Sequence, residues 1–90
     1  MSSKIERKVQ QFEVALTELL SDEEAIMAVN QSVDDFADRA ELSDVIVERQ
    51  ENYTTKVLTK KKKGLTIVKF EITCTAPEGI DIADLYAEVM

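Results

Sequence analysis

The stretch Leu65-Thr66-Ile67-Val68-Lys69-Phe70-Glu71-Ile72-Thr73-Cys74-Thr75 alternates apolar and polar residues over most of its length. A period of two predicts a strand that buries one face. The apolar residues of that face are Val68, Phe70, Ile72 and Cys74. Leu65 and Ile67 are apolar but would point to the opposite face of the strand. We therefore expect either a bulge near Val68 or burial of both faces near the start of the strand.

The residues on both sides of this strand predict the rest of an antiparallel β-meander. The preceding Lys61-Lys62-Lys63-Gly64 is typical of a hairpin tip, because Gly64 can adopt a positive φ. Before the tip, β-branched residues predict strands at 45–47 and 53–60. After the strand, Pro77 and Gly79 end it, and Asp81 can cap a helix over residues 80–89.

The N-terminal half carries two apolar stripes with helical spacing. The first stripe, within residues 4–20, consists of Ile5, Val9, Phe12, Leu16 and Leu19. The second, which extends to residue 41, consists of Ile26, Val29, Val33, Phe36 and Ala40. Between them, Ser21 and Glu24 form a capping-box pattern, which predicts that a second helix begins there. The alternative is one continuous helix over residues 4–40, because no Gly or Pro enforces a break.

Together these elements predict one α+β domain over residues 1–90 with the order ααβββα. A helical hairpin (1–41) is followed by a three-stranded antiparallel meander (44–75) and a short C-terminal helix (80–89). A chain of 90 residues can bury one modest core.

The predicted order and length resemble those of the bacterial histone-like HU proteins, whose long β-arms grip DNA as a dimer. The resemblance is architectural. Arg49-Gln50-Glu51-Asn52 stands where that family carries a Gly-aromatic-Gly segment, and four lysines replace its arginine-rich arm with a tip proline. It therefore implies no site residues in this chain.

The net charge of −7 is segregated along the chain. Residues 1–44 and 70–90 are acidic, whereas residues 45–69 are basic. No apolar run is long enough to span a bilayer and the N-terminus leads into charged residues, so we expect neither membrane association nor export. The lone Cys74 has no disulfide partner, which favours a reducing compartment, the cytoplasm.

Patterns for catalysis and cofactor binding are missing from the sequence. The chain has no His, which removes the usual base of Ser-His and Cys-His chemistry. With only two glycines, it has no phosphate-binding loop. Cys74 lies on the apolar face of its strand and is expected to be a buried structural thiol. We therefore expect no enzymatic activity, no cofactor and no metal site.

A first candidate partner-binding surface is acidic. Asp34, Asp35 and Asp38 lie opposite the apolar stripe of the second helix and would attract a basic protein. Their replacement by Asn is expected to preserve or slightly raise stability, because neighbouring carboxylates repel each other.

A second candidate surface is the predicted hairpin tip, formed by Lys60, Lys61, Lys62 and Lys63. Clustered lysines attract nucleic-acid phosphates or an acidic protein surface. They also serve a plain structural purpose, since lysines keep strand edges from pairing with other chains.

The sequence thus favours a small, acidic, non-enzymatic interaction or regulatory protein that binds a protein partner, expected to be basic. Homodimerisation is expected, because small domains gain stability from association. Two alternatives remain: a nucleic-acid-binding protein that uses the lysine tip, and an acidic inhibitor that imitates nucleic acid and blocks a DNA- or RNA-binding protein.

Overall fold

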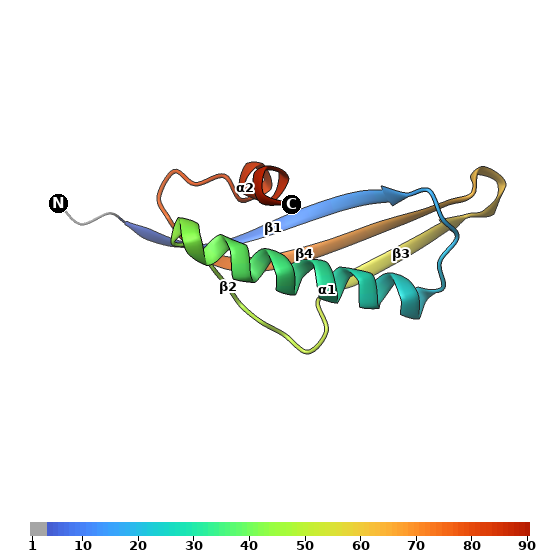
Figure 1. Cartoon of the computed structure of the whole chain (residues 1–90), viewed down its shortest axis with the longest axis horizontal. Coiled ribbons are helices and arrows are strands. Elements are labelled where there is room, and N and C mark those ends of the chain that lie inside the picture. Colours follow the sequence, from blue (N-terminus) through green and yellow to red (C-terminus); the bar gives the residue numbers. More distant parts are fainter. Residues whose placement is uncertain (1–3) are drawn as a thin grey trace.

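A computed structural model of the chain describes residues 4–90 and gives the order βαβββα (Figure 1). The strands are β1 (Ile5–Leu16), β2 (Ile46–Val47), β3 (Thr55–Lys60) and β4 (Leu65–Pro77). The helices are α1 (Asp22–Ala40) and α2 (Ile82–Val89), and short 3-10 turns occupy Glu41–Ser43 and Lys61–Lys63. Residues 1–3 of the expected single domain lie outside the described part.

The sheet is built around β4. β1 pairs antiparallel with one edge of β4 along its whole length, from Ile5 opposite Pro77 to Leu16 opposite Thr66. β2 and β3 both pair antiparallel with the other edge of β4, one after the other along it. The predicted meander is therefore wrong, because β2 pairs with β4 instead of β3.

The first predicted helix is also wrong, because residues 5–16 form strand β1. The side chains that turn toward the core are those of Lys8, Gln10, Phe12, Val14 and Leu16, all half-buried. Two of these five are polar, which hides the period of two, whereas the exposed Ile5 and Val9 complete a false helical stripe. The alternative of one helix over residues 4–40 fails for the same reason.

The second predicted helix is confirmed as α1, including its start. The Ser21 hydroxyl accepts a hydrogen bond from the Glu24 amide at 3.2 Å, and the Glu24 carboxylate accepts one from the Ser21 amide at 3.1 Å. This reciprocal bonding satisfies amides that have no partner within the helix. The buried face of α1 consists of Ala25, Val29, Val33, Phe36, Ala37 and Ala40.

The predicted turn before β4 and the predicted helix cap after it agree with the structure. Gly64 has φ 64° at the hairpin tip, and the Asp81 carboxylate accepts hydrogen bonds from the amides of Ala83 and Asp84 at the start of α2. The register of β4 with β1 and with β3 is continuous, so no bulge interrupts it near Val68. The element order begins with a strand, which separates this fold from the HU-like arrangement that the sequence suggested.

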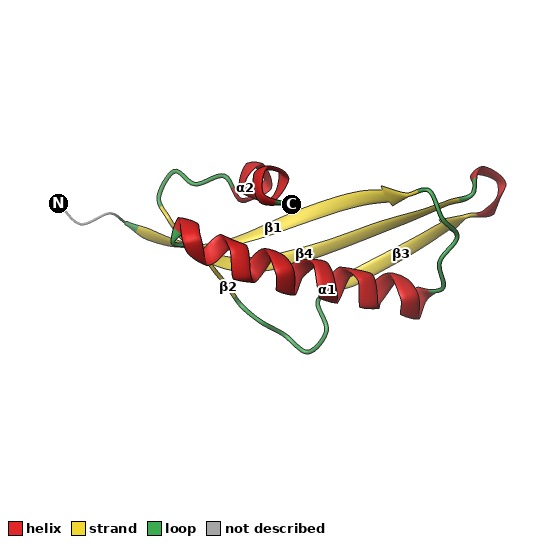
Figure 2. Ribbon diagram, in the orientation of Figure 1, coloured by secondary structure: helices red, strands yellow, loops and turns green. Residues whose placement is uncertain are grey.

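Both helices cover the same face of the sheet, which we call the inner face (Figure 2). Val33 and Phe36 of α1 and Ile82 of α2 join the inner side chains of β4 in one buried cluster. In the part of the chain that the structure describes, no helix covers the opposite, outer face of the sheet. The molecule is elongated, with extents of 55 × 23 × 18 Å. Neither helix has the length and apolar composition needed to cross a membrane within residues 4–90.

Candidate functional site

The outer face carries a lysine-rich surface at the hairpin end of the sheet. On β3, alternation places Lys56, Leu58 and Lys60 on this face, and on β4 it places Ile67 and Lys69 there. We call the group formed by Lys56, Lys60, Lys61, Lys62, Lys63 and Lys69 the lysine hairpin.

Two lysines of this group face each other across neighbouring strands. Lys56 lies directly opposite Lys69 in the β3–β4 register, a like-charge arrangement that is destabilising. Glu13 of β1 offsets part of the repulsion, because its carboxylate lies 4.0 Å from the Lys69 ammonium. Lys56 forms no ion pair with any residue in the range 4–90. A further acidic group would relieve this repulsion.

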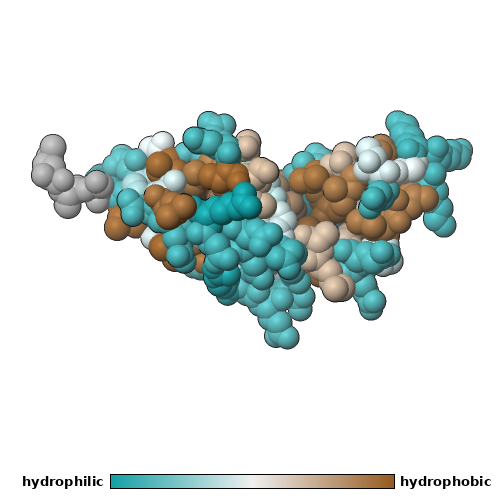
Figure 3. Space-filling view, viewed as in Figure 1, coloured by the Kyte–Doolittle hydropathy of each residue, from teal (hydrophilic) through white to brown (hydrophobic). Residues whose placement is uncertain are grey.

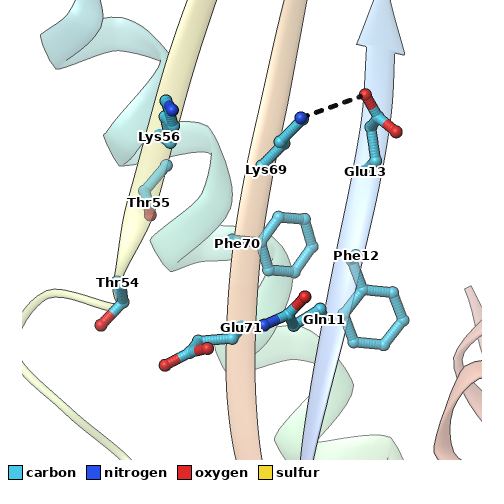
Figure 4. A pocket seen from close by; sticks show the side chains of 9 residues that line it. All are labelled: Gln11, Phe12, Glu13, Thr54, Thr55, Lys56, Lys69, Phe70 and Glu71. Carbon is cyan, nitrogen blue, oxygen red and sulfur yellow. Dashed lines mark ion pairs between the residues drawn. The ribbon is translucent and has the colours of Figure 1, made fainter.

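A shallow hollow of about 510 Å³ lies over these residues (Figure 4). Figure 4 views the sheet from the side opposite α1, and the hollow extends from Thr54 and Lys56 across Lys69 and Glu71 to Gln11. It is open to solvent. Its lining combines charged, amide and threonine residues with Phe12 and Phe70, whose side chains turn toward the inner face. It therefore suits contact with a protein surface better than enclosure of a small molecule.

The tip itself is fully exposed. Lys60 ends β3, and Lys61, Lys62 and Lys63 form the 3-10 turn that Gly64 closes. In the described residues, none of these four ammonium groups has an ion-pair partner. An apolar pair, Leu58 opposite Ile67, lies next to them on the outer face, and Leu58 is 42% exposed.

The acidic candidate surface has a different environment from the one expected. Arg49, in the loop between β2 and β3, places its guanidinium 3.8 Å from Asp34 and donates a hydrogen bond to Asp38 at 2.5 Å. The hydrogen bond with Asp38 raises the pKa of Arg49. The buried Tyr53 donates its hydroxyl hydrogen to Asp34 at 3.1 Å. Asp34 and Asp38 therefore fasten this loop to α1.

Asp35 is the remaining carboxylate of that group. It accepts a hydrogen bond from the Gln31 amide at 3.0 Å, one turn earlier in α1. The aspartates lie in the C-terminal half of α1, whereas the lysine tip lies beyond the N-terminal end of that helix (Figure 1). The structure therefore does not bring the two predicted groups together.

Cys74 is completely buried, as its position on the apolar face predicts. Burial, with a smaller contribution from the Glu48 carboxylate, raises the pKa of its thiol to about 11. The thiolate is the nucleophilic form, so this cysteine is poorly suited to chemistry near neutral pH.

All five aromatic side chains of the chain belong to the inner face. Phe36, Tyr53 and Phe70 are buried, and Phe12 and Tyr86 pack against them. The lysine hairpin thus has no aromatic neighbour on the outer face on which a base could stack.

Within residues 4–90, no group of three or more Asp, Glu, Cys or His side chains is arranged to hold a metal ion. No protein-family model, curated protein or solved structure matches this chain.

Proposed function

We propose that this protein is a small, non-enzymatic interaction protein that acts as a homodimer and binds a protein partner through the lysine hairpin. The observation that carries the proposal is the accumulation of six lysines on the open outer face and tip of the β3–β4 hairpin, in a chain whose net charge is −7. Five of them have no ion-pair partner within residues 4–90, and Lys69 pairs with Glu13. A basic surface on an acidic chain attracts an acidic partner by local charge.

The contacts of the aspartates make the lysine hairpin a better partner surface than α1. A basic partner at Asp34 and Asp38 would have to compete with Arg49, which already supplies a cation to both carboxylates. The same pairing weakens the alternative of an acidic inhibitor that imitates nucleic acid, because Arg49 neutralises part of the negative charge that such an inhibitor would present.

An acidic protein suits this surface better than nucleic acid does. Lysines alone support electrostatic binding to phosphates, but single-stranded nucleic acids also need aromatic stacking, and the outer face offers none. The apolar Leu58–Ile67 pair beside the lysines favours a protein surface that combines carboxylates with apolar groups.

The test compares the parent chain with two variants in affinity capture from cells, followed by mass spectrometry. One variant replaces Lys60, Lys61, Lys62 and Lys63 with Ser. The other replaces the same four with Arg and so conserves the charge. We expect acidic proteins to be captured by the parent and the Arg variant and lost with the Ser variant.

Two outcomes would contradict this proposal. Equal capture by the parent and the Ser variant would remove the lysine tip from partner binding. If duplex DNA or single-stranded RNA, titrated at 50 and 200 mM salt, bound the parent and not the Ser variant, the nucleic-acid-binding alternative would replace ours. Sedimentation equilibrium tests the homodimer, for which we expect twice the chain mass of 10.1 kDa.

A further inference from the structure

Within residues 4–90, β1 pairs only with β4, and its other edge has no partner. The Lys4 carbonyl accepts a hydrogen bond from the Glu78 amide at 2.7 Å, so the backbone groups of even-numbered β1 residues point toward β4. Odd-numbered residues, including Gln11, Glu13 and Ala15, then direct their amides and carbonyls to the free edge. An edge of this length is a ready template for a further strand.

The helix layer leaves the second half of β1 uncovered. The eight residues of α2 rise about 12 Å, whereas the twelve residues of β1 extend about 40 Å. α2 lies toward the N-terminal half of β1, and its Tyr86 contacts Phe12 with ring centres 4.8 Å apart. Val14 and Leu16 lie beyond this helix and are only half-buried.

An apolar cavity of about 100 Å³ marks this gap. Val14 and Leu16 line it from β1, Ala25 and Val29 from α1, and Tyr86 from α2. Figure 3 shows an apolar area in the same part of the molecule, between the helices and the hydrophilic hairpin tip. The Phe12 ring adds to it, since Figure 4 shows that ring on the free-edge side of β1.

We propose that the free edge of β1 pairs antiparallel with β1 of a second copy, centred on Phe12, so that α2 of each copy covers Val14 and Leu16 of the other. The inference rests on the homodimer of the proposed function and names its interface. A two-fold axis perpendicular to the sheet keeps the inner faces of both copies on one side. The product is one continuous sheet with a complete helix layer.

The register centred on Phe12 is compatible with the side chains and with the hydrogen bonding. Phe12 meets Phe12 of the second copy in a non-hydrogen-bonded pair, where side chains approach most closely. Gln11 lies opposite Glu13 of the other copy, and residues 8–16 pair without like charges face to face. A centre at Glu13 would instead place two glutamates opposite each other.

Charge at the two ends of the molecule favours the same orientation. The hairpin end carries the lysine tip, whereas the other end carries both signs of charge: Glu6, Glu78 and Asp81 beside Lys4, Arg7 and Lys8. Antiparallel pairing places the lysine tip of each copy at this end of the other, where carboxylates are present. A parallel arrangement would place the four tip lysines of both copies side by side.

The test uses the dimer mass of two matched variants. Val14→Lys puts a charge into the gap that α2 of the second copy would fill, whereas Ile5→Lys lies on the same strand, on the outer face, and outside residues 8–16. We expect Val14→Lys to sediment near the single-chain mass of 10.1 kDa and Ile5→Lys to remain dimeric. A dimeric Val14→Lys variant would overturn the proposed interface.

Amide hydrogen exchange of the unchanged chain keeps the inference testable if Val14→Lys fails to fold. The amides of Phe12 and Val14 bond to β4 in every state, whereas those of Gln11 and Glu13 would be protected only in the dimer. We expect dilution to increase exchange at Gln11 and Glu13 at least tenfold more than at Phe12 and Val14. Fast exchange at Gln11 and Glu13 in a dimeric sample would overturn only the β1 interface, whereas a monomer at all concentrations would also remove the homodimer from the proposed function.

Discussion

At the scale of single residues, Tyr53 links the loop between β2 and β3 to α1. Its side chain is 3% exposed, and its hydroxyl donates a hydrogen bond to Asp34. Its backbone amide donates a hydrogen bond to the side-chain oxygen of Asn30 at 3.2 Å. The residue thus combines core packing with two anchors on one helix.

We predict that Tyr53→Phe lowers the free energy of unfolding by about 1 kcal/mol, because it removes one hydrogen bond and leaves the packing of the ring in place. Urea denaturation followed by circular dichroism measures the change.

The same contacts change the prediction for Asp34 and Asp38. From the sequence alone, their replacement by Asn is expected to preserve or slightly raise stability. Because Arg49 and Tyr53 bind these carboxylates, we now predict that the replacement lowers the free energy of unfolding. An unchanged midpoint in both variants would show that the loop is held by other contacts.

The buried thiol of Cys74 predicts a dependence of stability on pH. Its pKa is about 11 in the folded chain, against an ordinary value of 9.0. As the pH rises from 9 to 11, the thiol ionises in the unfolded chain but stays protonated in the folded one, so the folded state loses stability over that window. Below pH 9 this contribution is fully present.

We therefore expect the free energy of unfolding of the parent to fall more steeply between pH 8.5 and 10.5 than that of a Cys74→Ala variant. The variant loses stability at every pH because of the cavity it creates, so the slope is the quantity to compare. Denaturant titrations at several pH values measure it. Parallel slopes would mean that the thiol is as accessible to water in the folded chain as in the unfolded one.

At the scale of secondary-structure elements, the parts of the fold that depend on neighbouring residues could be predicted from the sequence. The capping box at Ser21 and Glu24, the turn at Gly64 and the cap at Asp81 each involve groups within three residues of one another. Their outcome is decided locally, so the pattern and the structure agree.

β1 could not be predicted in this way, because its partner β4 lies about sixty residues further along the chain. Its inner face includes Lys8, whose ammonium donates a hydrogen bond to the Ile80 carbonyl at 2.6 Å. Only the folded chain supplies that acceptor, so no neighbouring residue in the sequence indicates that Lys8 faces inward. The candidate site shows the same limit: Arg49 reaches Asp34 and Asp38 only because the loop folds back over α1.

The lysine tip is an element that we predict to be dispensable for folding. Its side chains are exposed and its four adjacent positive charges repel one another, so replacement of Lys60, Lys61, Lys62 and Lys63 by Ser should change the free energy of unfolding by about 0.5 kcal/mol or less. Thermal and urea unfolding measure this change. A decrease in the free energy of unfolding well above that value would mean that the tip stabilises the hairpin. Capture by the Ser variant would then have to be compared with capture by the Arg variant.

At the scale of the whole molecule, the elongated shape separates two ways of forming a dimer. The chain is 55 Å long and 23 Å wide. The lysine tip of one copy could bind end to end with the carboxylates at the opposite end of another, Glu6, Glu78 and Asp81. Such contacts are heterologous and leave one lysine tip and one opposite end free for further growth. Pairing along β1 is isologous and closes after two copies.

The two arrangements differ in length, which small-angle X-ray scattering measures directly. Pairing centred on Phe12 sets the copies side by side, since this residue lies within β1 and the paired range covers residues 8–16 of its twelve-residue length. We predict a dimer whose maximum dimension stays close to the 55 Å of one chain while its width about doubles. An end-to-end pair would approach twice that length, and its length would grow with concentration. A dimer of about twice the length of one chain would exclude pairing along β1. It would indicate that the lysine tip mediates self-association. The outer face of the sheet would then be the surface left for a separate partner.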